Sequence, residues 1–336
     1  MAQKVTLAGN IIVDNVKTIT AWPEKGMLVP ITSVKRSPGG AVPNSGIDLK
    51  TLDPSVEVAA FGKVGDDDAG DFVRNFMSGH GLDVSDVKSV SGTPTTFTDV
   101  MTVASTGERT FFNMHGADSA LVPEDIDPAK LGCDIFHLGY LLLLDGLDAE
   151  DAEYGTKAAR LLAKVQSSGI KTSLDIVSEQ SDRFARIVRP ALKYCDYVVI
   201  NEVEGSLATG LSALDENGRA SEANLRRICE GLFELGVGEQ VVVHCPELSV
   251  SLDRTGHFAA VPSLELPSGW IKGSVGAGDA FCAGMLYAFL KGMSAEEGMR
   301  LASCSAAMNL AVSDSVSGAK SLAETLSLES RFSRRK

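Results

Sequence analysis

Several features that mark large protein classes are missing from this sequence. No run of Lys and Arg is longer than residues 334–336, and 31 basic against 44 acidic residues give a net charge of −13. A field of that sign repels nucleic acid and anionic membranes, so neither is expected as a partner. No segment has eighteen uncharged apolar residues, and the N-terminus runs into an alternating strand without a signal-peptide core. The prediction is a cytoplasmic protein.

Paired cysteines and the common nucleotide-binding loops are also missing. The six cysteines form no C-x-x-C pair and have no histidines at zinc-site spacing, so reduced core thiols are expected. His244 and Cys245 are adjacent, but no third ligand has a recognisable spacing, which favours a structural role. The P-loop pattern G-x-x-x-x-G-K-[ST] occurs nowhere, and no G-x-G-x-x-G follows the first strand. A P-loop enzyme is excluded and a dehydrogenase is disfavoured.

The pattern that is present alternates strand-like and helix-like segments. Strands are predicted over residues 5–9, 56–62, 134–140, 171–177, 197–201 and 241–245. Helices are predicted near 40–52, 68–79, 150–168, 221–235, 278–291 and 295–312. This order predicts a Rossmann-like α/β fold with a mostly parallel central sheet covered by helices on both faces. Since no linker divides the chain, residues 1–336 are expected to form a single domain.

Two segments, about 15–36 and 93–114, interrupt this order with short alternating strands. In the second, residues 105–107 form a hairpin turn between strands that carry Phe97, Phe111 and Phe112. Together the segments are expected to form a small β lid over the carboxyl ends of the main strands, where open α/β sheets bind ligands. An ordinary surface hairpin is the alternative.

A glycine-rich turn at residues 273–281 precedes an apolar helix. Backbone N–H groups at such a helix start lack partners and attract anions, so Gly276, Ala277 and Gly278 could hold a phosphate. Asp279 could then accept the proton of a substrate hydroxyl, and its position at the helix start predicts a low pKa. A plain helix cap is the alternative.

Two further segments have side chains suited to a polyol. Gly39 and Gly40 leave room for a ligand ring against the main chain, and the Asn44 amide can both donate to and accept from vicinal hydroxyls. Asp14, after the first strand, could accept hydrogen bonds from adjacent hydroxyls. Each of these residues could also be explained as part of an ordinary turn.

Asn201 and Glu204 follow the strand at 197–201 directly. On a first helical turn they face the same way and could hold waters of a magnesium ion that bridges nucleotide phosphates. Acidic residues at a helix start need no such role, so the pair has two interpretations.

In chain order, these segments resemble the ribokinase-like, or PfkB, carbohydrate kinase family. The resemblance is carried by GNIIVD (9–14), PGGAVPN (38–44), FGKVGDDDAG (61–70), NEVE (201–204), GAGDAF (276–281) and Gly318-Ala319. It implies a small β lid on the α/β core and ATP-dependent phosphorylation of a hydroxyl on a sugar or related polyol. A nucleoside or phosphosugar kinase of the same fold, or a non-catalytic sugar or nucleotide sensor, is the alternative.

The resemblance also implies residue roles. Asp279 would be the catalytic base, and Gly276, Ala277 and Gly278 the anion hole at the nucleotide phosphates. Residues that would hold the substrate are Asp14, Gly39, Gly40, Asn44 and, beside the lid turn, Arg109. Asn201 and Glu204 would organise Mg²⁺ through water.

Departures from the family pattern limit these implications. Residues 273–275 are Gly-Ser-Val where the family commonly has Asp-Thr-Thr, so a monovalent-cation site is not expected. Cations for a phosphosugar, with Lys17, Lys35, Arg36 and Arg109 as candidates, follow no diagnostic pattern, which favours an unphosphorylated sugar. An exposed small sheet has edges and an apolar face that need cover, so a homodimer through the lid is expected.

Overall fold

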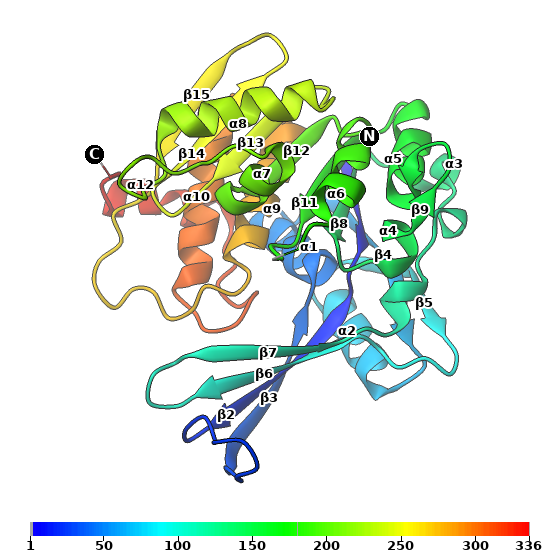
Figure 1. Ribbon diagram of the computed structural model, residues 1–336, viewed down its shortest axis with the longest axis vertical. Coiled ribbons are helices and arrows are strands. Elements are labelled where there is room, and N and C mark those ends of the chain that lie inside the picture. Colours follow the sequence, from blue (N-terminus) through cyan, green and yellow to red (C-terminus); the bar gives the residue numbers. More distant parts are fainter. Residues whose placement is uncertain (1–2, 180, 336) are drawn as a thin grey trace.

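The large sheet dominates the computed structural model, which describes residues 3–179 and 181–335. In this part of the chain nine strands have the order β15-β14-β13-β12-β11-β8-β1-β4-β5 (Figure 1). Their bounds are β1 (Lys4–Gly9), β4 (Glu57–Gly65), β5 (Asp83–Val90), β8 (Ile135–Leu141), β11 (Lys171–Ile176), β12 (Tyr197–Asn201), β13 (Gln240–His244), β14 (Leu248–Asp253) and β15 (Phe258–Pro262). Strands from β13 to β5 pair in parallel, whereas β14 and β15 extend one edge antiparallel. The predicted mostly parallel sheet is confirmed.

Helices cover both faces of this sheet because its strands are apolar on both sides. In β12, Val198 and Ile200 join one buried cluster and Val199 joins the other, as strand alternation requires. The first cluster includes residues of α5 (Lys157–Ser167), α6 (Phe184–Leu192), α7 (Glu202–Thr209) and α8 (Glu222–Glu234). The second includes residues of α1 (Ala41–Leu52), α2 (Asp68–Gly79), α9 (Ala277–Lys291) and α10 (Ala295–Leu310). The site helices α1 and α9 therefore share one face.

Short elements complete the described chain. They are η1 (Ala117–Ala120), η2 (Pro123–Asp125), α3 (Pro128–Leu131), α4 (Asp145–Asp148), β9 (Glu150–Asp151), β10 (Gly155–Thr156), α11 (Leu322–Leu326) and α12 (Leu328–Arg331). The helix predicted near 150–168 begins only at Lys157, because β9 and β10 form a small hairpin and Thr156 caps the helix. Strands β5, β14 and β15, and helix α6, were not predicted; the polar β5 has no apolar run to reveal it.

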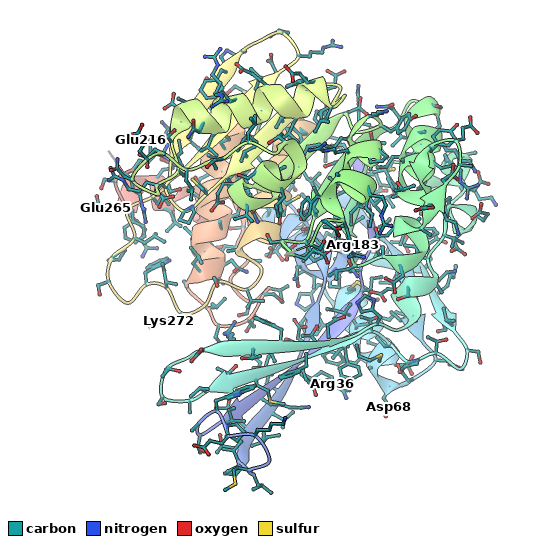
Figure 2. All side chains as sticks on the ribbon, in the orientation of Figure 1. Arg36, Asp68, Arg183, Glu216, Glu265 and Lys272 are labelled. Carbon is teal, nitrogen blue, oxygen red and sulfur yellow. The ribbon has the colours of Figure 1, made fainter. Side chains whose placement is uncertain are left out.

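A second sheet projects from the body as the predicted lid (Figure 1). Its strands are β2 (Ile12–Ile19), β3 (Ile31–Gly39), β6 (Phe97–Val103) and β7 (Arg109–Met114), in the order β3-β2-β6-β7. Figure 2 shows Arg36 at the base of this sheet, where its guanidinium lies 5.6 Å from the ring centre of Phe72 on α2.

The two faces of the lid differ. Strand register places Asp14, Lys35 and Arg109 on the same face. This face meets the loop after α10, since Lys35 Nζ lies 3.2 Å from Asp314 Oδ2 and Arg109 Nη2 donates to Ser313 O at 3.1 Å. The opposite face carries the charged pair Lys17 and Asp99 and, toward the lid tip, an apolar patch that includes Trp22, Met101 and Phe112. Finally, no helix among the described residues has the length and hydropathy needed to span a bilayer.

Candidate active site

The candidate site lies where the first residues of α1 and α9 meet the ends of β1 and β8. Asp279, in the first turn of α9, is its centre and is only 5% exposed. Asn44 Nδ2 donates to Asp279 Oδ2 at 2.9 Å, and Tyr140 Oη donates to Asp279 Oδ1 at 2.5 Å. Each carboxyl oxygen thus has one fixed donor and a further lone pair for a substrate proton.

The pKa of Asp279 differs from the sequence prediction. Burial raises it to about 6, and the hydrogen bonds from Tyr140, Asn44 and Ser45 oppose that rise. The prediction of a low pKa is therefore wrong, because loss of water outweighs the position at a helix start. At neutral pH the carboxylate is still mostly ionised, and it is a better proton acceptor than an exposed aspartate.

The helix start beside Asp279 carries no side-chain cap among the described residues. Its N-cap is Gly276, which has a φ of 79°, and a Cβ there would lie 2.6 Å from Ser315 O. An added Cβ on Gly278, by contrast, would meet no described atom within 4 Å. The turn therefore needs glycine at 276 for its backbone, while Gly278 borders free space. This is the arrangement predicted for binding an anion.

A cavity of about 490 Å³ extends from that free space. Its polar and small lining residues include Asn201, Ser274, Ala277 and Gly278, and its apolar wall continues along α10. His244 and Cys245 also line it; the His244 ring packs on Phe281 at 4.4 Å, and burial lowers its pKa to about 4. A neutral, stacked histidine agrees with the structural role predicted for it.

On the lid side, Asp14 and Arg109 approach the centre. Burial, followed by the charge of Asp279, raises the pKa of Asp14 to about 7, and Arg109 opposes this rise. A Cβ on Gly39 would lie 2.5 Å from Asp14 Oδ2, and one on Gly40 would lie 2.6 Å from Asn10 O. Protein atoms thus occupy the side-chain position of both glycines, so a larger residue at either position would displace Asp14 or Asn10. Contact of a ligand with the main chain of these glycines stays a prediction.

Asn201 and Glu204 face the same way, but they bond to each other. Asn201 caps α7, and its Oδ1 accepts from the N–H groups of Val203 and Glu204. Glu204 Oε1 accepts from Ser178 Oγ and Asn201 Nδ2, while Oε2 accepts from the Asn201 N–H. Three of about four carboxylate lone-pair sites are used, so one is left for a water. Oxygen donors of this kind fit the hydration shell of Mg²⁺.

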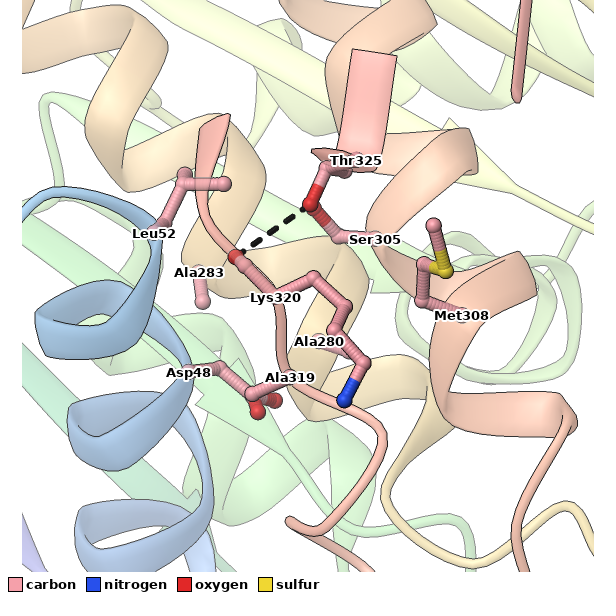
Figure 3. A pocket seen from close by; sticks show the side chains of 9 residues that line it. All are labelled: Asp48, Leu52, Ala280, Ala283, Ser305, Met308, Ala319, Lys320 and Thr325. Atoms are coloured by element: carbon pink, nitrogen blue, oxygen red, sulfur yellow. Dashed lines mark hydrogen bonds between the residues drawn. The ribbon is translucent and has the colours of Figure 1, made fainter. Parts of the chain in front are cut away.

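A third acid, Asp48, lies behind the site in a small cavity between α1, α9 and α10 (Figure 3). Among the described residues, neither of its carboxyl oxygens has a hydrogen-bond partner. Burial, and then the charge of Asp279, raise its pKa well above the ordinary value. We infer that Asp48 is uncharged at neutral pH, so it adds little negative charge beside Asp279.

Two residues of the site, Tyr140 and Asn10, were not predicted as functional from the sequence. Tyr140 is the last residue of the strand predicted over 134–140, but nothing in a lone tyrosine shows that it reaches Asp279. Asn10 Oδ1 accepts from the Tyr140 N–H at 2.8 Å, and Asn10 Nδ2 donates to Asp118 at 2.7 Å. Asn10 thereby ties the ends of β1 and β8 together and places Tyr140.

A mostly parallel sheet, a β lid and a buried acid at an uncapped helix start together define a ribokinase-like kinase fold. Comparison with known proteins agrees. The sequence matches the pfkB family of carbohydrate kinases over residues 3–321. It is 23% identical to a ribokinase of Haemophilus influenzae over 328 residues, 97% of this chain and 98% of that protein. It is 25% identical to a 5-dehydro-2-deoxygluconokinase of Clostridium perfringens, across 81% and 78% of the two chains.

Among solved structures, Arabidopsis thaliana ribokinase complexed with ribose and ATP matches with a TM-score of 0.81 and 21% identity, covering 98% of this chain and 99% of that one. The chain belongs to the pfkB family of carbohydrate kinases. It is an enzyme that transfers a phosphoryl group from ATP to a hydroxyl of a sugar or related polyol. A non-catalytic sensor is not favoured.

Proposed function

We propose that Asp279 is the catalytic base and that residues 276–278 hold the transferring phosphoryl group. The observation that carries this proposal is the position of Asp279 between Asp14 on the lid side and the open N-terminus of α9, which borders the large cavity. A hydroxyl that approaches Asp279 from the lid side would face a phosphoryl group at residues 276–278. Phosphoryl transfer depends mainly on such positioning and on charge stabilisation.

The cavity beside α9 is proposed to bind ATP. Its large apolar wall suits a nucleobase, and the uncapped helix start at its inner end suits the phosphates. Asn201 and Glu204 are proposed to orient waters of Mg²⁺ there. When bound, that ion would neutralise phosphate charge. Residues 273–275 offer no carboxylate of the kind that would hold a monovalent cation, so none is proposed.

The acceptor is proposed to be an unphosphorylated sugar. Asp14 and the Asn44 amide can accept from and donate to vicinal hydroxyls, and Asn44 Oδ1 is buried without a partner among the described residues. The cations that a phosphosugar would need are already engaged. Lys17 pairs with Asp99 at 2.5 Å, and Lys35 and Arg109 bond the loop after α10. Gly39 and Gly40 support the site through packing.

The chain is further proposed to be one cytoplasmic kinase domain that dimerises through its lid. Strand β1 of the large sheet leads directly into strand β2 of the lid, so the two sheets share one continuous segment. A second open cavity, of about 490 Å³, lies over the apolar patch of the lid. Its lining residues include Trp22 and Phe112, whose rings stack with centroids 6.2 Å apart. Exposed apolar groups such as Leu28, which is 91% exposed, favour burial against a second copy. Sedimentation that shows only monomer would contradict this.

The decisive experiment measures ADP release from Mg-ATP with a panel of pentoses, hexoses, sugar acids, phosphosugars and nucleosides. Asp279→Asn is compared with Asp68→Asn, which changes an exposed acid in the first turn of α2 (Figure 2). Turnover with an unphosphorylated sugar that is lost only in Asp279→Asn supports the proposal. Equal turnover in both variants contradicts Asp279 as base, and a response to phosphosugars or nucleosides alone contradicts the proposed acceptor.

A further inference from the structure

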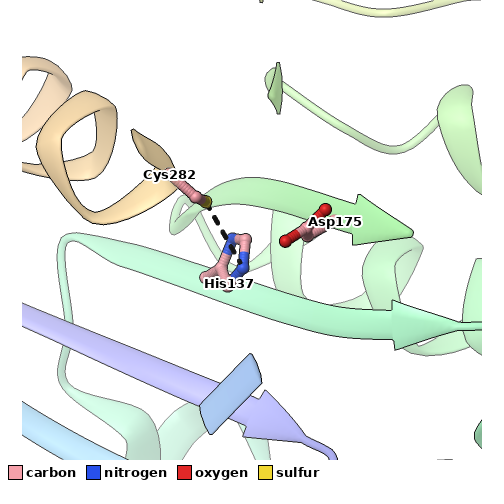
Figure 4. Close-up of side chains that lie close together, drawn as sticks. All are labelled: His137, Asp175 and Cys282. Atoms are coloured by element: carbon pink, nitrogen blue, oxygen red, sulfur yellow. Dashed lines mark hydrogen bonds between the residues drawn. The ribbon is translucent and has the colours of Figure 1, made fainter. Parts of the chain in front are cut away.

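Three buried side chains with metal-binding atoms meet beneath the catalytic helix (Figure 4). His137 comes from β8, Asp175 from β11 and Cys282 from α9. Their ligand atoms lie within 4.8 Å of one another, and His137 Nε2 is 3.8 Å from Cys282 Sγ. We propose that His137, Asp175 and Cys282 bind a divalent transition-metal ion of the Zn²⁺ type, at a site separate from the magnesium and nucleotide site.

The donor set determines this class of ion. Nitrogen, sulfur and carboxylate oxygen together suit Zn²⁺, whereas Mg²⁺ prefers oxygen alone. Tetrahedral zinc with bonds of about 2.3 Å to sulfur and about 2.0 Å to nitrogen separates those two atoms by about 3.6 Å. The observed 3.8 Å between Nε2 and Sγ is close to that separation. Three protein ligands leave a fourth position open, whereas structural zinc sites have four protein ligands.

Residues next to the cluster orient His137 toward Cys282. His137 Nδ1 pairs with Ser173 Oγ at 3.1 Å, so Nε2 is the atom that faces Cys282. A Cβ on Gly139 would lie 3.5 Å from His137 Nε2 and 3.4 Å from the Cβ of Asp175. The same Cβ would also lie 2.8 Å from the Cβ of Ala41, so only glycine at 139 leaves His137 and Asp175 in contact with no side chain from this position between them.

Charge balance makes such an ion compatible with full burial. Burial lowers the pKa of His137 to about 4, so its imidazole is neutral and has a free lone pair. Burial raises the pKa of Cys282 and of Asp175 well above their ordinary values, so both hold a proton when no ion is bound. A divalent ion would displace these two protons to solvent and would form bonds to thiolate and carboxylate. The product has no net charge.

Occupancy of this site should inhibit the kinase, an effect that rests on the proposed role of Asp279. Cys282 is three residues after Asp279, one helical turn along α9. A metal bond to Cys282 Sγ would fix this part of α9 and shift Asp279 relative to Asn44 and Tyr140, which donate to its carboxylate. Because all three ligands are buried, loading should be slow.

Cobalt provides the test, since thiolate-bound Co²⁺ absorbs light and Zn²⁺ displaces it. The full chain is incubated with Co²⁺, then with Zn²⁺, and compared with Cys282→Ser and with Cys229→Ser, a buried control on α8 outside the cluster. We expect one thiolate–cobalt band in wild type and Cys229→Ser, and none in Cys282→Ser. Preincubation with Zn²⁺ should lower sugar-dependent turnover at least 10-fold more in wild type than in Cys282→Ser.

Absence of the band in wild type, or its persistence in Cys282→Ser, overturns the site. Should Cys282→Ser fail to fold, Asp175→Asn replaces it and should weaken cobalt binding while the thiolate band remains; unchanged affinity overturns the site. A cobalt band without zinc inhibition overturns only the inhibitory effect. Cobalt binding in a protein that never turns over a sugar contradicts the proposed function and leaves the metal site standing, so the two failures are distinguishable.

Discussion

Two helices begin at the candidate site in opposite ways. At α7, the Asn201 side chain accepts from two backbone N–H groups, and Glu204 accepts from a third. At α9, the N-cap is Gly276, and no described side chain caps the first turn. The first helix start satisfies its own donors. At the second, the Ala277 N–H donates to Ser274 O, while the N–H groups of Gly278 and Asp279 have no described partner and are left for a ligand. A glycine cap beside free space thus indicates anion binding better than acids at a helix start do.

The largest effect is expected from a change of Asp279, in the first turn of α9. Asp279→Asn keeps the shape but removes the proton acceptor, so kcat should fall by about 10²- to 10⁴-fold. The melting temperature should change little, because the buried carboxyl already carries a desolvation cost that the amide avoids. Steady-state turnover and thermal unfolding measure the two effects. Near-normal kcat would contradict the role of Asp279.

The second test compares substitutions of two glycines, Gly276 and Gly278, at the start of α9. Gly278→Val places its side chain in free space where phosphate is proposed to bind, so we expect turnover at low ATP to fall by about 10²-fold, comparable with loss of an oxyanion donor. Stability should not fall, because valine favours helix more than glycine does. Gly276→Ala should instead lower the free energy of unfolding by about 1–2 kcal/mol, because its φ is 79°. Equal loss of stability in both variants would contradict the distinction.

Tyr140→Phe should have a smaller effect that depends on pH. The base must be ionised, so kcat/KM falls as pH drops through the Asp279 pKa of about 6. The phenol lowers that pKa, so its removal should raise the pKa and move the acid limb to higher pH; a rise of about one unit would lower turnover at neutral pH about 2-fold. Asp14 titrates nearby, with a pKa of about 7, and burial raises the pKa values of Asp48 and Asp175 well above their ordinary values. The shift between variants is therefore the measured quantity.

Tyr197→Phe is the matched control, because it removes a phenol from β12 whose ring stacks on Phe289. Its pH profile should coincide with that of the wild type. If the Tyr140→Phe profile also coincides with it, Tyr140 has no part in tuning Asp279.

The limits of prediction from sequence follow from what each residue contacts. The Gly276–Asp279 turn is local, so its glycines and its acid are sufficient to suggest the proposed anion site and base. The pKa of Asp279 depends instead on burial beneath β8 and α1, and on Tyr140, which is 139 residues away along the chain. The surroundings of Gly39 could not be predicted from the sequence either, because Asp14 from another strand fills its side-chain position. Local patterns therefore predict the chemistry of a site, while its tuning comes from long-range packing.

The smallest expected effect tests the closed helix start. Asn201→Ala removes the cap of α7 and should cost about 0.5–2 kcal/mol in the free energy of unfolding. Ser221→Ala removes the corresponding cap of α8, where Ser221 Oγ accepts from the Asn224 N–H at 3.2 Å, and should cost a similar amount. If Asn201 also orients magnesium-bound waters, only Asn201→Ala will need more Mg²⁺ for half-maximal turnover. An identical Mg²⁺ requirement in both variants would make Asn201 a cap alone. The start of α7 would then bind no ligand, in contrast to the proposed role of the start of α9.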